Sequence, residues 1–195
     1  VVIDKPAGLL TVATAPGADE DTALRRMQDY ARHLNPRRPF VGLVHRLDRD
    51  TSGALAFALT PAAREALRAL FRAHRIERSY VALVQGQPRG DSGQIDLPIH
   101  EGYVSGRRRV ARPGEEAMPA LTRWRVLERF PAAALLELTL ETGRQHQIRV
   151  HLAHARPAGA RAGSHVRQEL RADDQPERRP AVPRRRFVVD EELAG

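Results

Sequence analysis

The sequence predicts an α+β fold with a mixed, mainly antiparallel sheet and flanking helices. Short segments with the alternating polarity of strands are interspersed with segments of helical periodicity. Several expected strands follow one another closely enough to form hairpins, which favours antiparallel pairing over a doubly wound parallel sheet. The chain has 195 residues, of which 42% are hydrophobic, so one domain with a sizeable core is expected.

The start of the chain contains two expected strands and one expected helix. Residues 1–12 read as two short strands, VVI and LLTV, on either side of a Pro-Ala-Gly turn. Asp21 or Thr22 can cap the helix that follows, and Pro36 ends it. The apolar side chains of this helix recur at helical spacing and are Leu24, Met27, Ala31 and Leu34.

The middle of the chain continues the alternation of strands and helices. Residues 54–60 predict a strand, and Pro61 suits the first turn of a helix over residues 62–74. Residues 80–84 predict the next strand. Residues 89–120 are polar and loop-rich, with a cluster of three arginines at Arg107, Arg108 and Arg109.

The last patterned segment is a hairpin followed by a helix. Residues 122–127 and 135–141 predict two strands, and the second alternates leucine with glutamate or threonine. Residues 143–154 follow a Thr-Gly turn and predict a short helix. From residue 155 to 195 the chain is dense in Arg, Ala, Pro and Gly, so we expect a divergent, disordered basic tail after a folded domain of residues 1–154.

The composition favours a polyanionic partner. The formal net charge is +8, and Lys or Arg that neutralise phosphates release counterions. The chain has no cysteine, which excludes disulfides and thiolate chemistry and fits a cytoplasmic protein. No apolar run approaches the ~20 residues of a membrane helix, so no membrane partner is expected.

The segment HRLDRDTSG, residues 45–53, carries the candidate chemistry. Asp48 lies in a polar loop between arginines, and a nearby cation lowers an Asp pKa by about 1–3 units. An ionised Asp can act as a nucleophile or stabilise a positive centre at a sugar carbon. The alternative is a capping loop with surface ion pairs. A serine hydrolase is not favoured, because Ser52 does not lie in a G-x-S-x-G elbow.

Other polar residues also have structural alternatives. Tyr80 fits an ordinary half-buried strand aromatic, and Arg144 and Arg149 fit solvent-facing helix charges. A metal site is not favoured, because His151 and His154 share a helix face without a third ligand and no H-E-x-x-H motif occurs.

Four segments together resemble the RluA-like family of RNA pseudouridine synthases. VVIDKPAGLLTV is similar to the family's first block, and HRLDRDTSG matches its catalytic-loop pattern H-R-L-D-x-x-[ST]-[SG]-G. RSYVALVQG resembles its tyrosine-bearing strand, and LETGRQHQIRVHLA resembles its arginine-bearing block. The segments follow the family's order across residues 1–154, which implies the pseudouridine-synthase fold for this range.

The resemblance implies a role for each matching residue. Asp48 stands at the catalytic aspartate, and Arg149 at the basic residue that pairs with it. Tyr80 stands at the aromatic that stacks on the uracil and helps to remove a proton. Arg46 corresponds to the side chain that fills the space left by the everted nucleotide. The other implied substrate-binding residues are His45, Ile148 and Arg144.

The implied function is an isomerase that converts uridine to pseudouridine in structured RNA, either ribosomal or transfer RNA. The resemblance implies no cofactor and no metal, and we expect a monomer whose partner is RNA. A catalytically inactive RNA-binding remnant of the same fold is the alternative. An unrelated basic nucleic-acid-binding module is a third, in which Asp48 is dispensable.

The resemblance ends after His154. Family members continue with a Gly-His-Pro-like turn, a Gly-Asp pair and further strands, whereas this chain continues with ARPAGARAGSHVRQEL. The change resembles either a shifted reading frame in a GC-rich gene or a divergent C-terminus. We therefore expect the family's C-terminal strands to be missing, which exposes a sheet edge.

Overall fold

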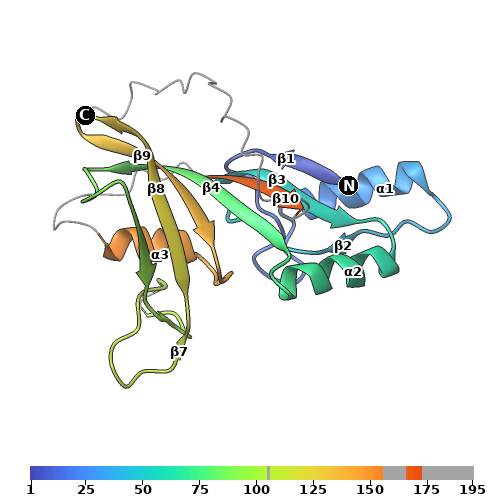
Figure 1. The fold of residues 1–195 in the computed structure, drawn as a ribbon. Coiled ribbons are helices and arrows are strands. Elements are labelled where there is room, and N and C mark those ends of the chain that lie inside the picture. The colour runs from blue at the N-terminus through green and yellow to red at the C-terminus, as the bar shows by residue number, and fades with distance from the viewer. Residues whose placement is uncertain (105, 156–165, 173–195) are drawn as a thin grey trace.

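The protein is built around one large sheet, as a computed structural model shows (Figure 1). The structure describes residues 1–104, 106–155 and 166–172. The eight strands of the sheet run in the order β1-β3-β10-β4-β9-β8-β5, with β2 paired to β3. These strands are β1 (Val2–Lys5), β2 (Gly42–Leu43), β3 (Thr51–Ala58), β4 (Ile76–Gln85), β5 (Ser92–Asp96), β8 (Leu121–Phe130), β9 (Ala133–Leu140) and β10 (Val166–Ala172).

The pairing confirms the predicted fold class. Each pair of neighbouring strands in the sheet is antiparallel except β10 and β3, which are parallel. A separate two-stranded sheet joins β6 (Ile99–His100) to β7 (Ala117–Met118). None of the helices in the described ranges is long and apolar enough to cross a membrane.

Within the described residues, three helices flank the sheet. Figure 1 shows α1 (Ala23–Leu34) and α2 (Pro61–Arg72) beside the half of the sheet that contains β1 and β3. The third helix, α3 (Gln147–His154), lies on the other half, where it contacts β8. Strands β10 and β4 lie between the two halves. The contact of His146 with Asp48 brings the turn before α3 against the loop before β3.

The helices begin where their caps predict. The side chain of Thr22 accepts a hydrogen bond from the N–H of Arg25 at the start of α1. Thr60 caps α2 in the same way, and Pro61 occupies its first turn. Helix α1 buries Ala23, Met27 and Ala31, which lie on one face, whereas Leu34 is exposed.

The main core lies between the sheet and its helices. Its largest fully buried apolar side chains include Leu55 and Phe57 of β3 and Leu138 of β9. The predicted alternation of β9 is confirmed, because Leu136 and Leu138 are buried and Glu137 pairs with an arginine of β8. Tyr80 of β4 belongs to the same cluster, so one wall of the site described below is part of the core.

Three segments differ from the sequence prediction. Residues 9–12 do not form a strand, because Leu10 makes a single bridge to Thr22 and the Thr11 side chain bonds another loop. Residues 89–120 contain three short strands, β5 to β7, which lack the periodicity of longer strands. Residues 166–172 form β10 rather than an irregular tail, because backbone hydrogen bonds to both β3 and β4 do not depend on apolar periodicity. The rest of the predicted tail lies outside the described residues.

Candidate active site

A pocket of about 220 Å³ opens where three distant segments meet. The segments are the loop before β3, the strand β4, and the turn that leads into α3. Its lining residues are Arg46, Leu47, Asp48, Thr51, Arg78, Tyr80, Leu140, Gly143, Arg144, Gln145, His146, Gln147, Ile148 and Arg149. The pocket therefore brings together a carboxylate, a phenol and several guanidinium groups.

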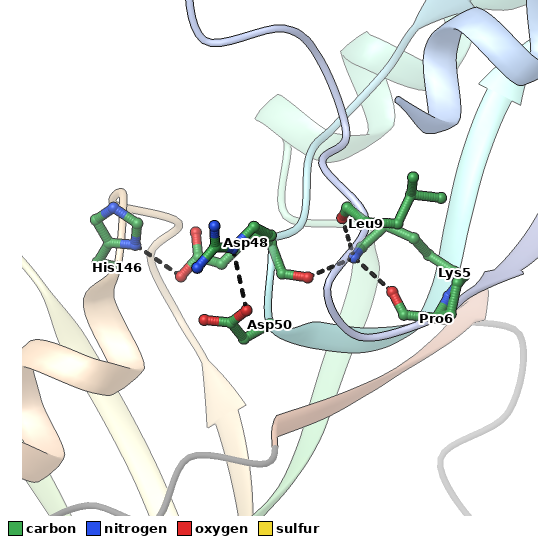
Figure 2. Close-up of polar contacts among 7 residues, drawn as sticks. Lys5, Pro6, Leu9, Asp48, Asp50 and His146 are labelled. Atoms are coloured by element: carbon green, nitrogen blue, oxygen red, sulfur yellow. Dashed lines mark hydrogen bonds and ion pairs between the residues drawn. The ribbon is translucent and has the colours of Figure 1, made fainter. Parts of the chain in front are cut away.

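The N-terminal segment holds the Asp48 loop in place (Figure 2). The fully buried ammonium group of Lys5 donates hydrogen bonds to the carbonyls of Pro6, Leu9 and Arg49, at 2.8, 2.6 and 2.9 Å. Burial lowers the pKa of Lys5, while the carboxylates of Asp50 and Asp48 oppose this shift. The N-terminal segment that contains Lys5 thus holds the backbone next to Asp48 in place.

A second clamp acts on the residue before Asp48. The hydroxyl of Thr11 donates to the carbonyl of Leu47 at 2.7 Å and accepts from its N–H at 3.1 Å. The N–H of Thr51 in turn donates to the carbonyl of Asp48 at 3.2 Å. These bonds fix the backbone on both sides of Asp48.

The carboxylate of Asp48 contacts a histidine from the far end of the chain. The Nδ1 atom of His146 lies 2.7 Å from Oδ2 of Asp48, and both side chains are partly buried (Figure 2). An ionised carboxylate only accepts hydrogen bonds, so the proton of this contact belongs to Nδ1. The expected ion pair between Asp48 and Arg149 is absent from the contacts of the described residues.

Buried polar side chains anchor α3 beside the pocket. Gln147 donates to the hydroxyl of Thr122 at 3.0 Å and accepts from the N–H of Arg144 at 3.0 Å. Nε2 of His151, one turn further along α3, donates to the carbonyl of Leu97 at 3.0 Å, and its Nδ1 lies 2.9 Å from the Thr122 hydroxyl. Burial lowers the pKa of His151, which favours the neutral ring. These bonds set the start of the helix and therefore the place of His146.

Tyr80 forms the inner wall of the pocket. Its side chain is 9% exposed, and burial raises the pKa of the phenol to about 12, with Asp48 adding to the shift and Arg78 opposing it. Arg78 lies two residues before Tyr80 on β4, hence on the same face of the strand. A methyl group at Gly143 would lie 2.2 Å from Nη1 of Arg78, so only glycine leaves room for this guanidinium.

Most of the predicted site residues meet in this pocket. Besides Asp48 and Tyr80, the lining includes Arg46, Arg144, Ile148 and Arg149. Ile148 is buried, whereas the three arginines are exposed at the pocket. The Nε of Arg144 donates to the carbonyl of Pro119 at 3.0 Å.

His45 is placed elsewhere. Its ring stacks on Phe71 of α2, with centroids 4.7 Å apart, and its Nε2 accepts a hydrogen bond of 3.0 Å from the N–H of Ala56. Burial, assisted by the cation of Arg78, lowers its pKa to about 4. His45 thus joins β3 to α2 as a neutral side chain and does not line the pocket.

The loop that contains Arg108 lies next to the pocket, because Arg108 contacts the pocket residue Gln145. Arg108 is held by the carbonyls of His100 and Glu101, and its Nη2 lies 3.4 Å from Oε1 of Gln145. Its guanidinium also lies over the ring of Tyr103, 4.9 Å from the centroid, and Tyr103 is 52% exposed. An exposed aromatic ring backed by a cation is suited to stacking on a nucleobase.

Sequence reasoning missed His146 and Arg78 as site residues. The sequence patterns assign no role to His146, and within the described ranges no cluster of three metal-binding side chains occurs. Arg78 could have been found, because residues two apart on a strand share a face and Tyr80 was already a candidate. The contact of His146 with Asp48 had no local signal, since 98 positions separate the two residues.

The comparisons with known proteins point to one family. The family described as RNA pseudouridylate synthase matches residues 1–154. Ribosomal large subunit pseudouridine synthase D of Nitrosomonas europaea is 43% identical over 152 residues, which are 78% of this chain and 43% of that protein. Ribosomal large subunit pseudouridine synthase C of Yersinia pestis is 40% identical over 124 residues, which are 64% of this chain and 39% of that protein.

Solved structures agree with this similarity. Human RNA pseudouridylate synthase domain containing 4 superposes with a TM-score of 0.65 at 29% identity, covering 78% of this chain and 60% of that one. Human RNA pseudouridylate synthase domain containing 1, at 23% identity and a TM-score of 0.64, supports the fold alone. The chain spans about two fifths of the length of the two bacterial relatives.

Proposed function

Because the chain belongs to the RNA pseudouridylate synthase family, we propose that it isomerises uridine to pseudouridine in structured RNA. The reaction breaks the bond between N1 of the uracil and C1′ of the ribose and joins C1′ to C5. The proton on C5 leaves to solvent, and N1 gains one. No electrons are gained or lost, so the isomerisation calls for no redox cofactor.

One observation carries the proposal. Asp48, Tyr80 and Arg149 come from separate sequence blocks, and all three line a single pocket of about 220 Å³. The glycosidic bond breaks through a charge-separated state, and a carboxylate below C1′ stabilises the positive centre or attacks it. Tyr80 offers a flat face to the uracil and a hydroxyl near Asp48.

The remaining pocket residues serve the everted nucleotide. Extrusion of a base from a stacked RNA costs a few kcal/mol, and the planar cation of Arg46 offsets part of this by taking its place. Ile148 gives the base an apolar contact. Arg144 and Arg149 supply positive charge for phosphates at the mouth of the pocket. Arg108 and Tyr103 extend this surface to a neighbouring nucleotide.

The substrate is ribosomal or transfer RNA, and the bacterial relatives favour the ribosomal choice, since their names are those of ribosomal large subunit synthases. We expect the enzyme to act as a monomer in the cytoplasm. Mapping of pseudouridine in the cellular RNA of strains with and without the gene would identify the position. A map that is unchanged by the deletion argues against the proposed activity.

A substitution at Asp48 tests the chemistry directly. The substrate is ribosomal and transfer RNA from a strain that lacks the gene, labelled with tritium at C5 of uridine. Wild-type protein should release tritium, whereas Asp48→Asn should release none and still bind the RNA. Undiminished release by Asp48→Asn refutes the role of this carboxylate, and RNA binding without release by the wild type selects an inactive RNA-binding protein.

A further inference from the structure

His146 is the N-cap residue of α3 and has a left-handed backbone conformation. It occupies the N-cap of the helix, yet its side chain makes no capping hydrogen bond. Its backbone is left-handed, with φ 58° and ψ 19°, a conformation that is uncommon outside glycine, although histidine adopts it more readily than most residues. His146 therefore does not cap the helix with its side chain. Its left-handed backbone instead accompanies a ring that contacts Asp48.

The side chain is engaged with the carboxylate instead. Nδ1 of His146 lies 2.7 Å from Oδ2 of Asp48, across 98 residues of sequence (Figure 2). Within the part of the chain that the structure describes, no other side chain bonds the Asp48 carboxylate. One carboxylate oxygen is therefore held by the imidazole, which leaves the second oxygen to meet the sugar.

The left-handed turn also places the ring. The hydrogen bonds of Gln147 to Arg144 and Thr122 fix the first residue of α3. From this anchored point, a right-handed residue 146 would direct its side chain along a different path. The strain is thus tolerated because the surrounding bonds determine it, as is typical of residues that serve a site.

We propose that His146 is the positioning residue of Asp48, in addition to the residues that the family motifs assign. The inference rests on the proposed function, in which Asp48 is the reacting carboxylate. The Nδ1–H of His146 locks the Asp48 side chain in the rotamer that faces the incoming C1′. Arg149 then remains available for the RNA backbone at the same pocket. Since His146 acts through Asp48, its loss affects the rate of isomerisation and not the affinity for RNA.

Two substitutions separate the hydrogen bond from the backbone strain. His146→Gly removes the donor but adopts the left-handed conformation without cost. His146→Asn keeps a side-chain N–H close to the position of Nδ1, and Asn tolerates the left-handed region well. If the residue had only a structural role, both variants would behave alike, or the glycine variant would be the better one.

The measurements are the single-turnover rate of tritium release, the dissociation constant for the same labelled RNA, and the melting temperature. We expect His146→Gly to lose about 10- to 100-fold in rate, the loss that follows from one charge-assisted hydrogen bond. Its RNA affinity should stay within about threefold of the wild type, because no hydrogen bond to RNA is removed. His146→Asn should recover most of the rate.

Equal rates for the glycine and asparagine variants overturn the inference, as does a loss that appears only in RNA affinity. The melting temperatures show whether a slow variant is folded. The Asp48→Asn protein keeps this test separate from that of the proposed function. Wild-type protein that binds RNA without releasing tritium refutes the function, and an active Asp48→Asn refutes the role of that carboxylate. An inactive Asp48→Asn together with a fully active His146→Gly refutes only the positioning role.

Discussion

The ammonium group of Lys5 donates a hydrogen bond of 2.9 Å to the carbonyl oxygen of Arg49, the residue that follows Asp48. The same nitrogen also bonds the carbonyls of Pro6 and Leu9, so one buried cation ties two loops together. The sequence contains no other lysine. This side chain therefore connects the first block of the chain to the floor of the site.

Replacement of Lys5 should destabilise the fold. Lys5→Met keeps the aliphatic stem but removes the ammonium donor from three carbonyl oxygens, of which that of Arg49 still accepts from the N–H of Gly8 at 2.9 Å. We expect the free energy of unfolding to fall by about 2–4 kcal/mol, measured by denaturant titration. Arg37→Met, at an exposed position, is the matched control and should change it by less than about 0.5 kcal/mol. Equal effects of the two substitutions would contradict the clamp.

Local sequence patterns predicted those parts of the fold that depend on neighbouring residues. The helix that begins after Thr22 and the alternation of β9 both follow from spacing within a few residues. The contacts of Lys5 with Arg49 and of His146 with Asp48 cross 44 and 98 residues, so composition and periodicity carry no trace of them. His45 shows the opposite case, since its place in the motif HRLD suggested a pocket residue and its ring packs on α2 instead.

The burial of His45 should make stability depend on pH. Its pKa falls from 6.5 to about 4 on folding, so between these values the unfolded chain binds a proton that the folded chain does not. Above about pH 6.5, His45 causes no loss in the free energy of unfolding. As the pH falls toward 4, this free energy decreases by on the order of 2–3 kcal/mol. Unfolding titrations at pH 7, 5.5 and 4.5 measure the slope.

The His45→Asn variant isolates this contribution. It is expected to be less stable at pH 7, because it loses the stacking on Phe71, but its stability should decline less steeply with acid. Part of the slope remains, since burial lowers the pKa of His151 in the same direction. If the free energy of unfolding declines equally with pH in the variant and the wild type, His45 does not contribute to this pH dependence.

A methyl group at Gly143 should displace Arg78. The ideal Cβ at this position lies 2.2 Å from Nη1 of Arg78, a clash that the flexible guanidinium relieves by moving. We expect Gly143→Ala to cost less than about 1 kcal/mol in stability, because only a side-chain end moves. The kcat/KM for tritium release should fall about 10-fold, since Arg78 lines the pocket.

A double-mutant cycle tests that explanation. In an Arg78→Met background the further change Gly143→Ala should have little additional effect, because the clashing group is gone. Gly102→Ala is the matched control, since its Cβ meets its nearest neighbour at an ordinary 3.4 Å. Additive effects of Gly143→Ala and Arg78→Met would show that the glycine acts by another route.

Tyr80 should contribute to the rate through its hydroxyl more than through its ring. Tyr80→Phe preserves the apolar face in the core, so we expect the melting temperature and the RNA affinity to stay close to those of the wild type. The single-turnover rate should fall by about 10²–10⁴-fold, the range for loss of a general acid or base. The exposed Tyr30 of α1 provides the control, and Tyr30→Phe should leave the rate unchanged.

The pH dependence of the rate distinguishes the two uses of Tyr80. Burial raises the pKa of its phenol to about 12. At any pH below this value, the ionised fraction of the phenol increases about tenfold for each unit by which the pH rises. If the phenolate removes the proton from C5, the wild-type rate rises with this slope between pH 7 and 9, and the Tyr80→Phe rate does not. A wild-type rate that is flat over this interval leaves Tyr80 as a stacking partner and hydrogen-bond donor, because its proton is then never removed.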